Sequence, residues 1–521
     1  MAKGGILKNT AIVGGLTMVS RLLGLVREVL QADLIGAGIA QSAFTLAFAV
    51  PNMARKLFGE GALTAAFVPV FKGEVERVGV AKAAQLARAV MTMVLLLLAL
   101  AVGVALAGLV AADALSGWMA FTGSDRQSLI LSLVIILIPY MLAICAAAFG
   151  MGILNSLGRF TAASLMPALL NVGWILALVA LLFFPALTVA VRIRIVAGAI
   201  LVAGCGQAAF MFACMARVGV SPKPLFEGWR SEKVKLVWRN LGIAALGAGA
   251  VQVNYMLDQL LAQLASGWAA GVIGYAERLM DLPLGVIGVA FGTVLLPTFA
   301  GFFAKGELDS ARAALASSVQ SLLFVMLPAA AGLFVLAPEI TAVIYEHGEF
   351  DALSTLRVSR ALAVYALGLG FFGFQKSLIP WFQAQNDMKT PLRVSVATVV
   401  LNAILNILAV FGLPVEWRHV GLAGSTVCCA AFGCALLLSA AIRKNGSTGL
   451  RVTILPLAKM LFAAVLMAAA IALVRPLIVT RLSPLFALGL LIASGVAVYA
   501  LLSLVAMRDQ LRPLKRKLCR R

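Results

Sequence analysis

The chain has 521 residues, of which 62% are hydrophobic and only 12% charged, and its mean hydropathy is +1.03. Roughly a quarter of the residues of a soluble globular domain are charged, so this composition excludes that class and indicates a polytopic membrane protein. The formal net charge of +21 raises the question of a nucleic-acid partner, which depends on where the basic residues lie.

Apolar stretches long enough to cross a bilayer, about 20 residues each, recur along the whole chain with short polar breaks. Alternating strands of about ten residues, typical of membrane barrels, are absent from the pattern. We therefore expect an all-α polytopic membrane protein. Fourteen spans are predicted, at 6–31, 41–70, 84–111, 128–150, 160–184, 190–216, 240–266, 270–300, 313–337, 354–380, 391–413, 419–442, 453–474 and 483–506.

The first stretch continues through Arg21 and Arg27 without a small-residue cleavage site, so we expect it to remain as a helix and not to act as a cleaved signal. Lys and Arg concentrate on both tails and on the connections after even-numbered spans. The positive-inside rule then predicts that both termini are cytoplasmic. The loop 217–239 and the tail RPLKRKLCRR at 512–521 are expected to face anionic lipid headgroups, which disfavours a nucleic-acid partner.

The sequence lacks motifs for a metal centre or for nucleotide binding. The two histidines, His347 and His419, and the seven cysteines show no spacing typical of a metal centre. A Walker A loop is also absent. We therefore expect no enzyme activity and no cofactor. Any transport is expected to draw on Na⁺ or another ion gradient, the membrane potential, or the substrate's own gradient.

An internal repeat relates the two halves of the chain. The segment ALTAAFVPVFKGE, from residue 62, resembles VLLPTFAGFFAKGE, from residue 294. A second pair, 155–175 and 384–404, joins a polar turn with a basic residue to an apolar helix that carries an asparagine. Because each copy would span an even number of helices, we expect two pseudo-symmetric six-helix lobes around a central cavity. The predicted domains are 1–220 (N-lobe), 221–239 (basic cytoplasmic linker), 240–445 (C-lobe) and 446–521 (two extra helices and a basic tail).

Ionisable residues interrupt several of the spans. Each costs about 2.5 to 3.5 kcal/mol at a helix centre on insertion scales, and such residues normally face a bundle interior or a wet cavity. The first span carries Arg21, Arg27 and Glu28. The second and eighth spans carry two further sets: Asn52, Arg55, Lys56 and Glu60 after Pro51, and Glu277, Arg278 and Asp281.

Two interpretations of these residues remain open. Lys56 and Glu60, at i and i+4, can form a local pair, and Arg27 with Glu28 can lie near a membrane boundary and snorkel. Arg21, Arg55 and Arg278 lie in corresponding early helices of the two halves and have too few nearby carboxylates to neutralise them all. Several fixed guanidinium groups facing one cavity suit a polyanion, because the planar fork of Arg matches phosphate oxygens. We infer a diphosphate as the guest.

The segments SRLLGLVRE, PNMARKLFGEGALTAAFVPVF and YAERLMDLPLGVIGVAFGTVLLPTF resemble the signature segments of the MurJ (MviN) family of the MOP exporter superfamily, and the similarity extends over nearly the whole chain. The resemblance implies a fourteen-helix bacterial inner-membrane flippase. Its expected substrate is the undecaprenyl-diphosphate-linked peptidoglycan precursor, lipid II. This precursor would pass from the cytoplasmic to the periplasmic leaflet, as cell-wall biogenesis requires.

Position by position, the resemblance implies a substrate-binding role for polar residues of three spans. Ser42 stands where some relatives have Asp, and Ala49 where some have Lys, so models that need charge at those two positions are in doubt. The arginine set is intact. The implied substrate-binding residues are Arg21, Arg27, Asn52, Arg55, Glu60, Arg278 and Asp281.

The expected mechanism is a rocking of the two lobes. Arg21, Arg55 and Arg278 would hold the diphosphate, while Glu60 and Asp281 would tune these arginines as the gate switches. The undecaprenyl tail would stay in lipid or in a groove formed with the two extra C-terminal helices.

A monovalent-cation site is a further candidate. Asn254 with Asp258 and Asn402 with Asn406 form i, i+4 polar pairs, and Thr426 lies in the twelfth span. Oxygen atoms of Asp258, Asn402, Asn406 and Thr426 would supply the ligands, as the resemblance suggests for some members. The alternative is that these residues make interhelical hydrogen bonds, the usual role of Asn and Thr in membrane bundles.

Two other transport functions and one class of enzyme are the alternatives to lipid II transport. One is a flippase for another polyprenyl-linked oligosaccharide, and another is a cation-coupled drug antiporter of the same superfamily, whose cavity should be acidic and not rich in arginine. A membrane-bound enzyme would need clustered carboxylates or a nucleophile with a histidine, usually on a large loop. We expect a monomer whose partners are membrane lipids and the lipid-linked precursor.

Overall fold

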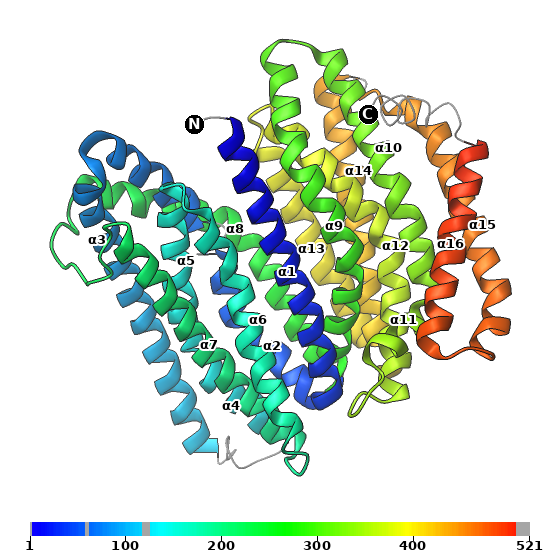
Figure 1. Ribbon diagram of the computed structural model, residues 1–521, viewed down its shortest axis with the longest axis horizontal. Coiled ribbons are helices and arrows are strands. Elements are labelled where there is room, and N and C mark those ends of the chain that lie inside the picture. The colour runs from blue at the N-terminus through cyan, green and yellow to red at the C-terminus, as the bar shows by residue number, and fades with distance from the viewer. Residues whose placement is uncertain (1–2, 58–61, 117–124, 447, 507–521) are drawn as a thin grey trace. The chain divides into compact units, whose positions relative to one another are not determined.

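The computed structural model describes residues 3–57, 62–116, 125–446 and 448–506, which are almost entirely helical and include no strand (Figure 1). The helices are α1 (Lys3–Ile35), α2 (Ile39–Ala54), α3 (Ala62–Ser116), α4 (Arg126–Leu137), α5 (Tyr140–Ser156), α6 (Phe160–Leu182), α7 (Val189–Arg217), α8 (Glu232–Ala265), α9 (Ala269–Ala304), α10 (Leu308–Val335), α11 (Ala337–Tyr345), α12 (Ala352–Gln383), α13 (Lys389–Gly412), α14 (Val415–Asn445), η2 (Leu450–Thr453), α15 (Ile454–Val479) and α16 (Pro484–Ala506).

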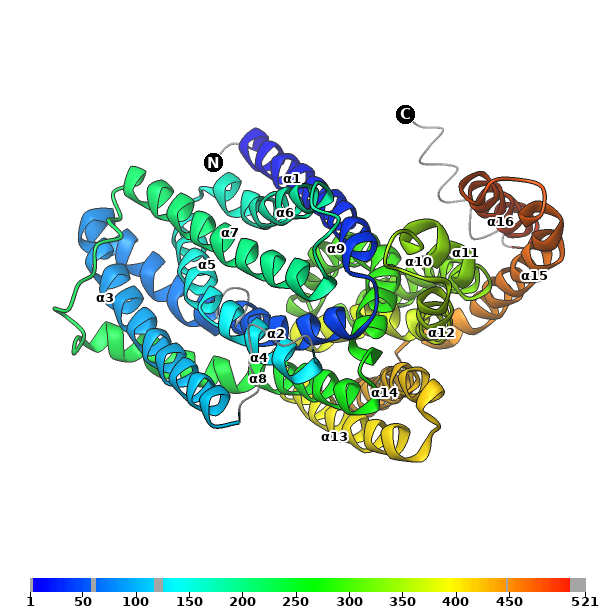
Figure 2. The ribbon, with the colours of Figure 1, turned by 90° about the horizontal axis from the view of Figure 1, so that it is seen from below.

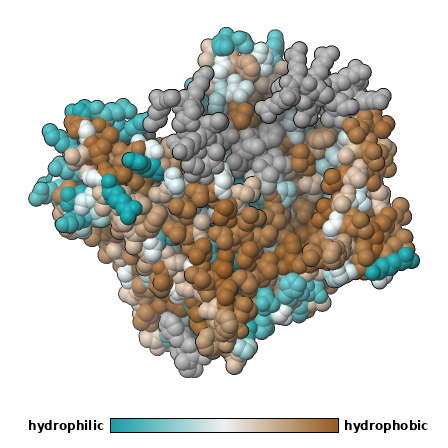
Figure 3. All heavy atoms as spheres, viewed as in Figure 1, coloured by the Kyte–Doolittle hydropathy of each residue, from teal (hydrophilic) through white to brown (hydrophobic). Residues whose placement is uncertain are grey.

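Within the described residues, ten helical segments are long and apolar enough to cross a membrane. Figure 3 shows hydrophobic side chains covering broad areas of the visible face, with hydrophilic ones gathered nearer the ends of the helices. The all-α polytopic membrane class is therefore confirmed. Each of the fourteen expected spans overlaps one or two of the helices, and the number of membrane crossings stays a prediction.

The two copies of the repeated KGE segment differ in local structure. In the second copy the segment forms the turn between α9 and α10, where Gly306 has a φ of 73°. In the first copy α3 continues through KGE and kinks at Gly79, which has φ 79° and ψ 167°. Only glycine adopts positive φ readily, so the break in α3 lies at Gly79. This kink falls between the spans predicted at 41–70 and 84–111, where a break was expected.

Two compact units divide the chain. The first comprises Met1–Gly271 with His347–Phe350, and the second comprises Val272–Glu346 with Asp351–Arg521. In the first unit, α1 packs on α6, α5 on α7, and α3 on both α5 and α8. In the second unit, α12 packs on α10 and α14, and α13 on α14. The unit boundary falls at Gly271, and the lobe boundary expected at 221–239 stays a prediction.

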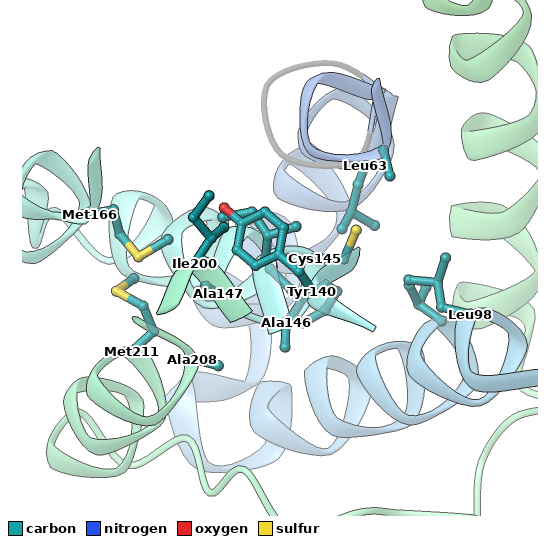
Figure 4. Packing of buried hydrophobic residues seen from close by; sticks show 14 of the residues in the cluster. Leu63, Leu98, Tyr140, Cys145, Ala146, Ala147, Met166, Ile200, Ala208 and Met211 are labelled. Carbon is teal, nitrogen blue, oxygen red and sulfur yellow. The ribbon is translucent and has the colours of Figure 1, made fainter. Parts of the chain in front are cut away.

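Small residues let the helices of the first unit approach closely. Gly204 of α7 lies against the ring of Tyr140, and a Cβ added at Gly204 would overlap that ring. Small residues at helix contacts are the usual means of close packing in membrane bundles. Figure 4 shows part of the resulting core, in which α3, α5, α6 and α7 contribute Leu63, Leu98, Tyr140, Cys145, Met166, Ile200 and Met211.

The last two long helices, α15 and α16, lie side by side in Figures 1 and 2 and pack against one another and against α10. Their buried faces include Met467 and Leu491, which cluster with Leu336. The hydroxyl of Tyr499 donates a hydrogen bond to the carbonyl oxygen of Phe324, 3.0 Å away. The C-terminal pair is thus part of the second compact unit.

Candidate functional site

Arg27 is held by neighbours on α1 and α6. Its Nη1 donates to Oδ1 of Asn171, 2.9 Å away, and its Nη2 pairs with the carboxylate of Glu28. Asn171 in turn donates from Nδ2 to the carbonyl oxygen of Ser20, at 3.0 Å. The amide of Asn171 therefore ties α6 to α1 and orients the guanidinium of Arg27. Arg27 and Glu28 thus pair with each other, and whether they also snorkel to a membrane boundary stays a prediction.

Aromatic rings form one wall beside Arg27. The guanidinium carbon lies 4.3 Å from the centroid of the Trp174 ring, a cation–π distance. Trp174 meets Phe44 and Phe48 of α2 edge-on, with centroids 5.5 and 5.6 Å apart. This stack connects α2 to α6 and leaves Arg27 less solvated than a surface arginine.

Arg21 occupies a different environment on the same helix. Its side chain is exposed, and no hydrogen bond or ion pair connects it to another residue in the described part of the chain. Arg21 lies six positions before Arg27, and the Oδ1 atom of Asn171 accepts its hydrogen bond from Arg27. Arg21 is thus open to an external anion.

The end of α2 carries the second set. Both Nε and Nη2 of Arg55 donate to Oδ1 of Asn52, each over 3.2 Å. The ammonium of Lys56 lies 4.8 Å from the ring centroid of Tyr255 in α8. Residues 55–57 form a π-helical turn beyond the buried Pro51, a departure that often marks functional positions. Glu60 lies outside the described residues.

The third set lies on α9 in the second unit. Arg278 and Asp281 are both exposed and one turn apart on the helix. Glu277 accepts a hydrogen bond at Oε1 from the hydroxyl of Tyr365 on α12, at 3.3 Å. Arg278 and Asp281 lie at a surface of their unit.

Of the proposed substrate residues, the structure brings Asn52 and Arg55 into direct contact. Arg21, Arg27 and Arg55 belong to the first unit and Arg278 to the second. Their meeting around one substrate is part of the proposal that follows.

The candidate cation ligands form two groups. Asn254 donates to Oδ2 of Asp258 at 3.2 Å in the first unit. In the second unit, Asn406 donates to Oδ1 of Asn402 at 2.7 Å, and both are buried. Thr426 donates to the carbonyl oxygen of Leu422 at 3.3 Å. Each of these contacts lies within one helix, so a role in hydrogen bonds between helices and a role in binding a cation both stay predictions.

A buried polar chain in the first unit was not predicted. Gln263 of α8 donates from Nε2 to the carbonyl oxygen and the hydroxyl of Ser42, at 2.7 and 3.0 Å. Arg126 of α4 donates to Oε1 of Gln263 at 2.7 Å. In the sequence, Ser42 stands out only as a departure from relatives. The hydrogen bonds between Ser42 of α2 and Gln263 of α8 produce no periodic pattern in the sequence. The glutamines in apolar helices were the one available cue.

Among the residues that the structure describes, no group of three or more His, Cys, Asp or Glu side chains is arranged to hold a metal ion. The described charged side chains of the three sets are four arginines, one lysine and the carboxylates of Glu28, Glu277 and Asp281. Such a collection suits the binding of an anionic group.

Comparisons with known proteins give one consistent result. A family model described as "Lipid II flippase MurJ" matches residues 31–493. A Rhizobium tropici protein named "Probable lipid II flippase MurJ" is 35% identical over 412 residues, which cover 77% of this chain and 75% of the relative.

Two solved structures are similar in fold. One, described as "Lipid II flippase MurJ, inward closed conformation", has a TM-score of 0.76 at 22% identity and covers 96% of this chain and 100% of its own. The other, an inward-facing multidrug resistance MATE family transporter of the MOP superfamily, has a TM-score of 0.65 at 16% identity and covers 84% and 99%. At these identities the two likenesses show the fold.

Proposed function

The chain belongs to the MurJ family, and from that premise we propose that it moves lipid II, the undecaprenyl-diphosphate-linked peptidoglycan precursor, across the bacterial inner membrane from the cytoplasmic to the periplasmic leaflet. One observation carries the proposal beyond family membership. Four arginines, Arg21, Arg27, Arg55 and Arg278, lie within the spans predicted at 6–31, 41–70 and 270–300. Permanent charges in a span are costly and normally face a bundle interior or a wet cavity, where an anionic substrate can meet them.

The four arginines would have different roles. Arg21 and Arg278 are exposed on their units and would contact the diphosphate directly. Arg55, which donates hydrogen bonds to Asn52, would add a third guanidinium from the end of α2. Arg27 has its own partners in Glu28 and Asn171, so it would set the positive field and hold α1 on α6.

Alternating access would expose these groups first to one side and then to the other. Asp281 would compete with the diphosphate for Arg278, and Glu60 for Arg55, so that each carboxylate helps release the product. The undecaprenyl tail would remain in lipid or against the face formed with α15 and α16. The two repeated lobes would be the bodies that rock.

The remaining assignments belong to the same proposal. Both termini would be cytoplasmic, and the protein would act as a monomer and carry out no chemical reaction on the lipid. Coupling would come from Na⁺ or the membrane potential, with Asp258, Asn402, Asn406 and Thr426 as candidate cation ligands. The proposal of cation coupling does not depend on the diphosphate site. It can be rejected while the diphosphate site is retained.

The test is depletion of the protein in cells, followed by measurement of the fraction of lipid II that a periplasmic probe can reach. Accessibility is expected to fall on depletion and to return with the wild-type chain. The Arg278→Ala variant is expected to reach the membrane folded, since Arg278 is exposed, without restoring accessibility. Unchanged accessibility on depletion would instead favour another polyprenyl-linked cargo.

A further inference from the structure

The connection between α7 and α8, residues 218–231, carries two aromatic side chains turned outward. Phe226 is 68% exposed and Trp229 is 51% exposed. The guanidinium carbon of Arg230 lies 5.1 Å from the centroid of the Trp229 ring. The connection therefore presents apolar rings and a cation at the same place.

The backbone of this connection is fixed on α3. Arg88 donates from Nε to the carbonyl oxygen of Lys223 at 2.9 Å and from Nη2 to that of Pro224 at 3.3 Å. The amide of Leu225 donates to the hydroxyl of Thr92 at 2.9 Å. Leu225 and the fully buried Val220 pack on the core of the unit. Val220 and Leu225 therefore face inward, and the attached backbone leaves Phe226 and Trp229 facing outward.

The attachment also places the connection beside the start of the span predicted at 84–111. It begins directly after α7, and Arg88 and Thr92 lie within the α3 segment, both of which are apolar enough to cross a bilayer. Residues 88 and 92 fall within the first turns of the span expected at 84–111. The rings therefore lie near the boundary of the hydrocarbon region, where Trp and other aromatic side chains are enriched.

The charges near the rings favour anionic lipid. Lys233 pairs with Glu74, and Lys235 with Glu232. Lys223 and Arg230, by contrast, have no carboxylate partner among the described residues, and both are exposed. Glu227 is the one acid between them. Two cations beside two rings at this level match a phospholipid headgroup with a net negative charge.

We propose that residues 220–230 form an interfacial anchor that inserts Phe226 and Trp229 into one leaflet and selects anionic phospholipid through Lys223 and Arg230. Its consequence is a fixed height for the first unit, because the anchor is bound to α3 and does not move as a free loop. The surface is separate from the arginines proposed to bind the diphosphate.

The experiment uses the full chain in nanodiscs in which either phosphatidylglycerol or phosphatidylcholine carries bromine near the top of its acyl chains. The contribution of Trp229 is obtained as the difference in tryptophan fluorescence between the wild type and Trp229→Phe. Brominated phosphatidylglycerol is expected to quench Trp229 at least twofold more than brominated phosphatidylcholine at equal mole fraction. Aqueous acrylamide is expected to quench Trp229 weakly.

Replacing both cations, with Lys223→Gln and Arg230→Gln, is expected to abolish the preference while leaving quenching by lipid in place. Trp417 is the matched control, because it is 48% exposed and lies under Arg360 at 4.8 Å. Its quenching should be the same in the doubly substituted chain. Strong quenching by acrylamide with none by either lipid would overturn the proposal and leave the rings free for a protein partner. Equal quenching by the two lipids in the wild type would overturn the selection of anionic lipid.

Discussion

Arg192 of α7 donates from Nη1 to the carboxylate of Glu349, 3.2 Å away, although the two residues are 157 positions apart. The same guanidinium donates to the carbonyl oxygens of Leu34 at 3.1 Å and Pro185 at 2.7 Å. The side chain of Arg192 is 10% exposed and that of Glu349 is 44% exposed. The contact with the carbonyl oxygen of Leu34 is buried, whereas those with Pro185 and Glu349 are partly buried.

The first prediction compares the two partners of this pair. Arg192→Ala leaves the buried carbonyl oxygen of Leu34 without its donor and is expected to destabilise the protein by about 1 to 3 kcal/mol, the usual cost of an unmet buried group. Glu349→Gln is expected to cost under about 1 kcal/mol, because exposed ion pairs contribute little. Thermal unfolding in detergent measures both, and equal losses would show that the ion pair dominates.

A second prediction concerns packing between α5 and α7. Gly204→Ala places a methyl group on the ring of Tyr140 and is expected to cost about 1 to 3 kcal/mol, as overpacked cores do. Gly198→Ala in the same helix is the matched control, since nothing lies within 4 Å of its added Cβ. The control should leave the melting temperature unchanged or raise it, because alanine favours helix more than glycine. If both variants melt alike, the close approach at Gly204 is absent.

A third prediction follows from Asp387, in the connection between α12 and α13. Hydrogen bonds from the side chain of Lys444 and from the amide of Thr390 lower its pKa to about 2, against an ordinary value of 3.8. A lowered pKa means that the carboxylate stabilises the folded connection at pH values above the ordinary pKa. The contribution is lost as pH falls through the lowered pKa.

Hydrogen exchange of the amides at 387–391 checks this dependence. Protection is expected to be constant from pH 8 down to about pH 4, after correction for intrinsic rates, and to fall below that. Asp387→Asn should weaken the protection at every pH and remove its dependence on acid. A wild-type profile that stays flat to pH 2 would mean that Lys444 and Thr390 do not act through the carboxylate.

The fourth prediction tests Asn171 as the residue that positions Arg27. Asn171→Ala removes the acceptor for Arg27 and the donor to Ser20, with an expected cost of about 1 kcal/mol for each hydrogen bond. Lipid II transport should fall more than the loss of folded protein explains. Asn171→Gln, which keeps the amide, should recover part of it. Full transport by the folded Ala variant would make the contact purely structural.

The long apolar helices and the ionisable positions inside them were predictable, because hydropathy and charge are local properties of the sequence. The partners of Arg27 were not, since Asn171 and Trp174 lie on a helix about 145 residues away and only packing brings them together. Their spacing of three residues in the apolar α6 was the available signal. The break between the spans predicted at 41–70 and 84–111 lies at Gly79, while KGE, which is compatible with both helix and turn, stays helical in α3.

The central claim is that Arg21, Arg55 and Arg278 hold the diphosphate of the substrate. Its most direct test is the affinity of the purified chain in nanodiscs for a polyprenyl diphosphate and for the matching monophosphate, in the wild type and in each arginine-to-alanine variant. Arg77→Ala, on an exposed part of α3, serves as control. We expect the preference for diphosphate to fall tenfold or more, about 1.4 kcal/mol, in all three variants and to persist in the control. An unchanged preference in the three folded variants would contradict the claim.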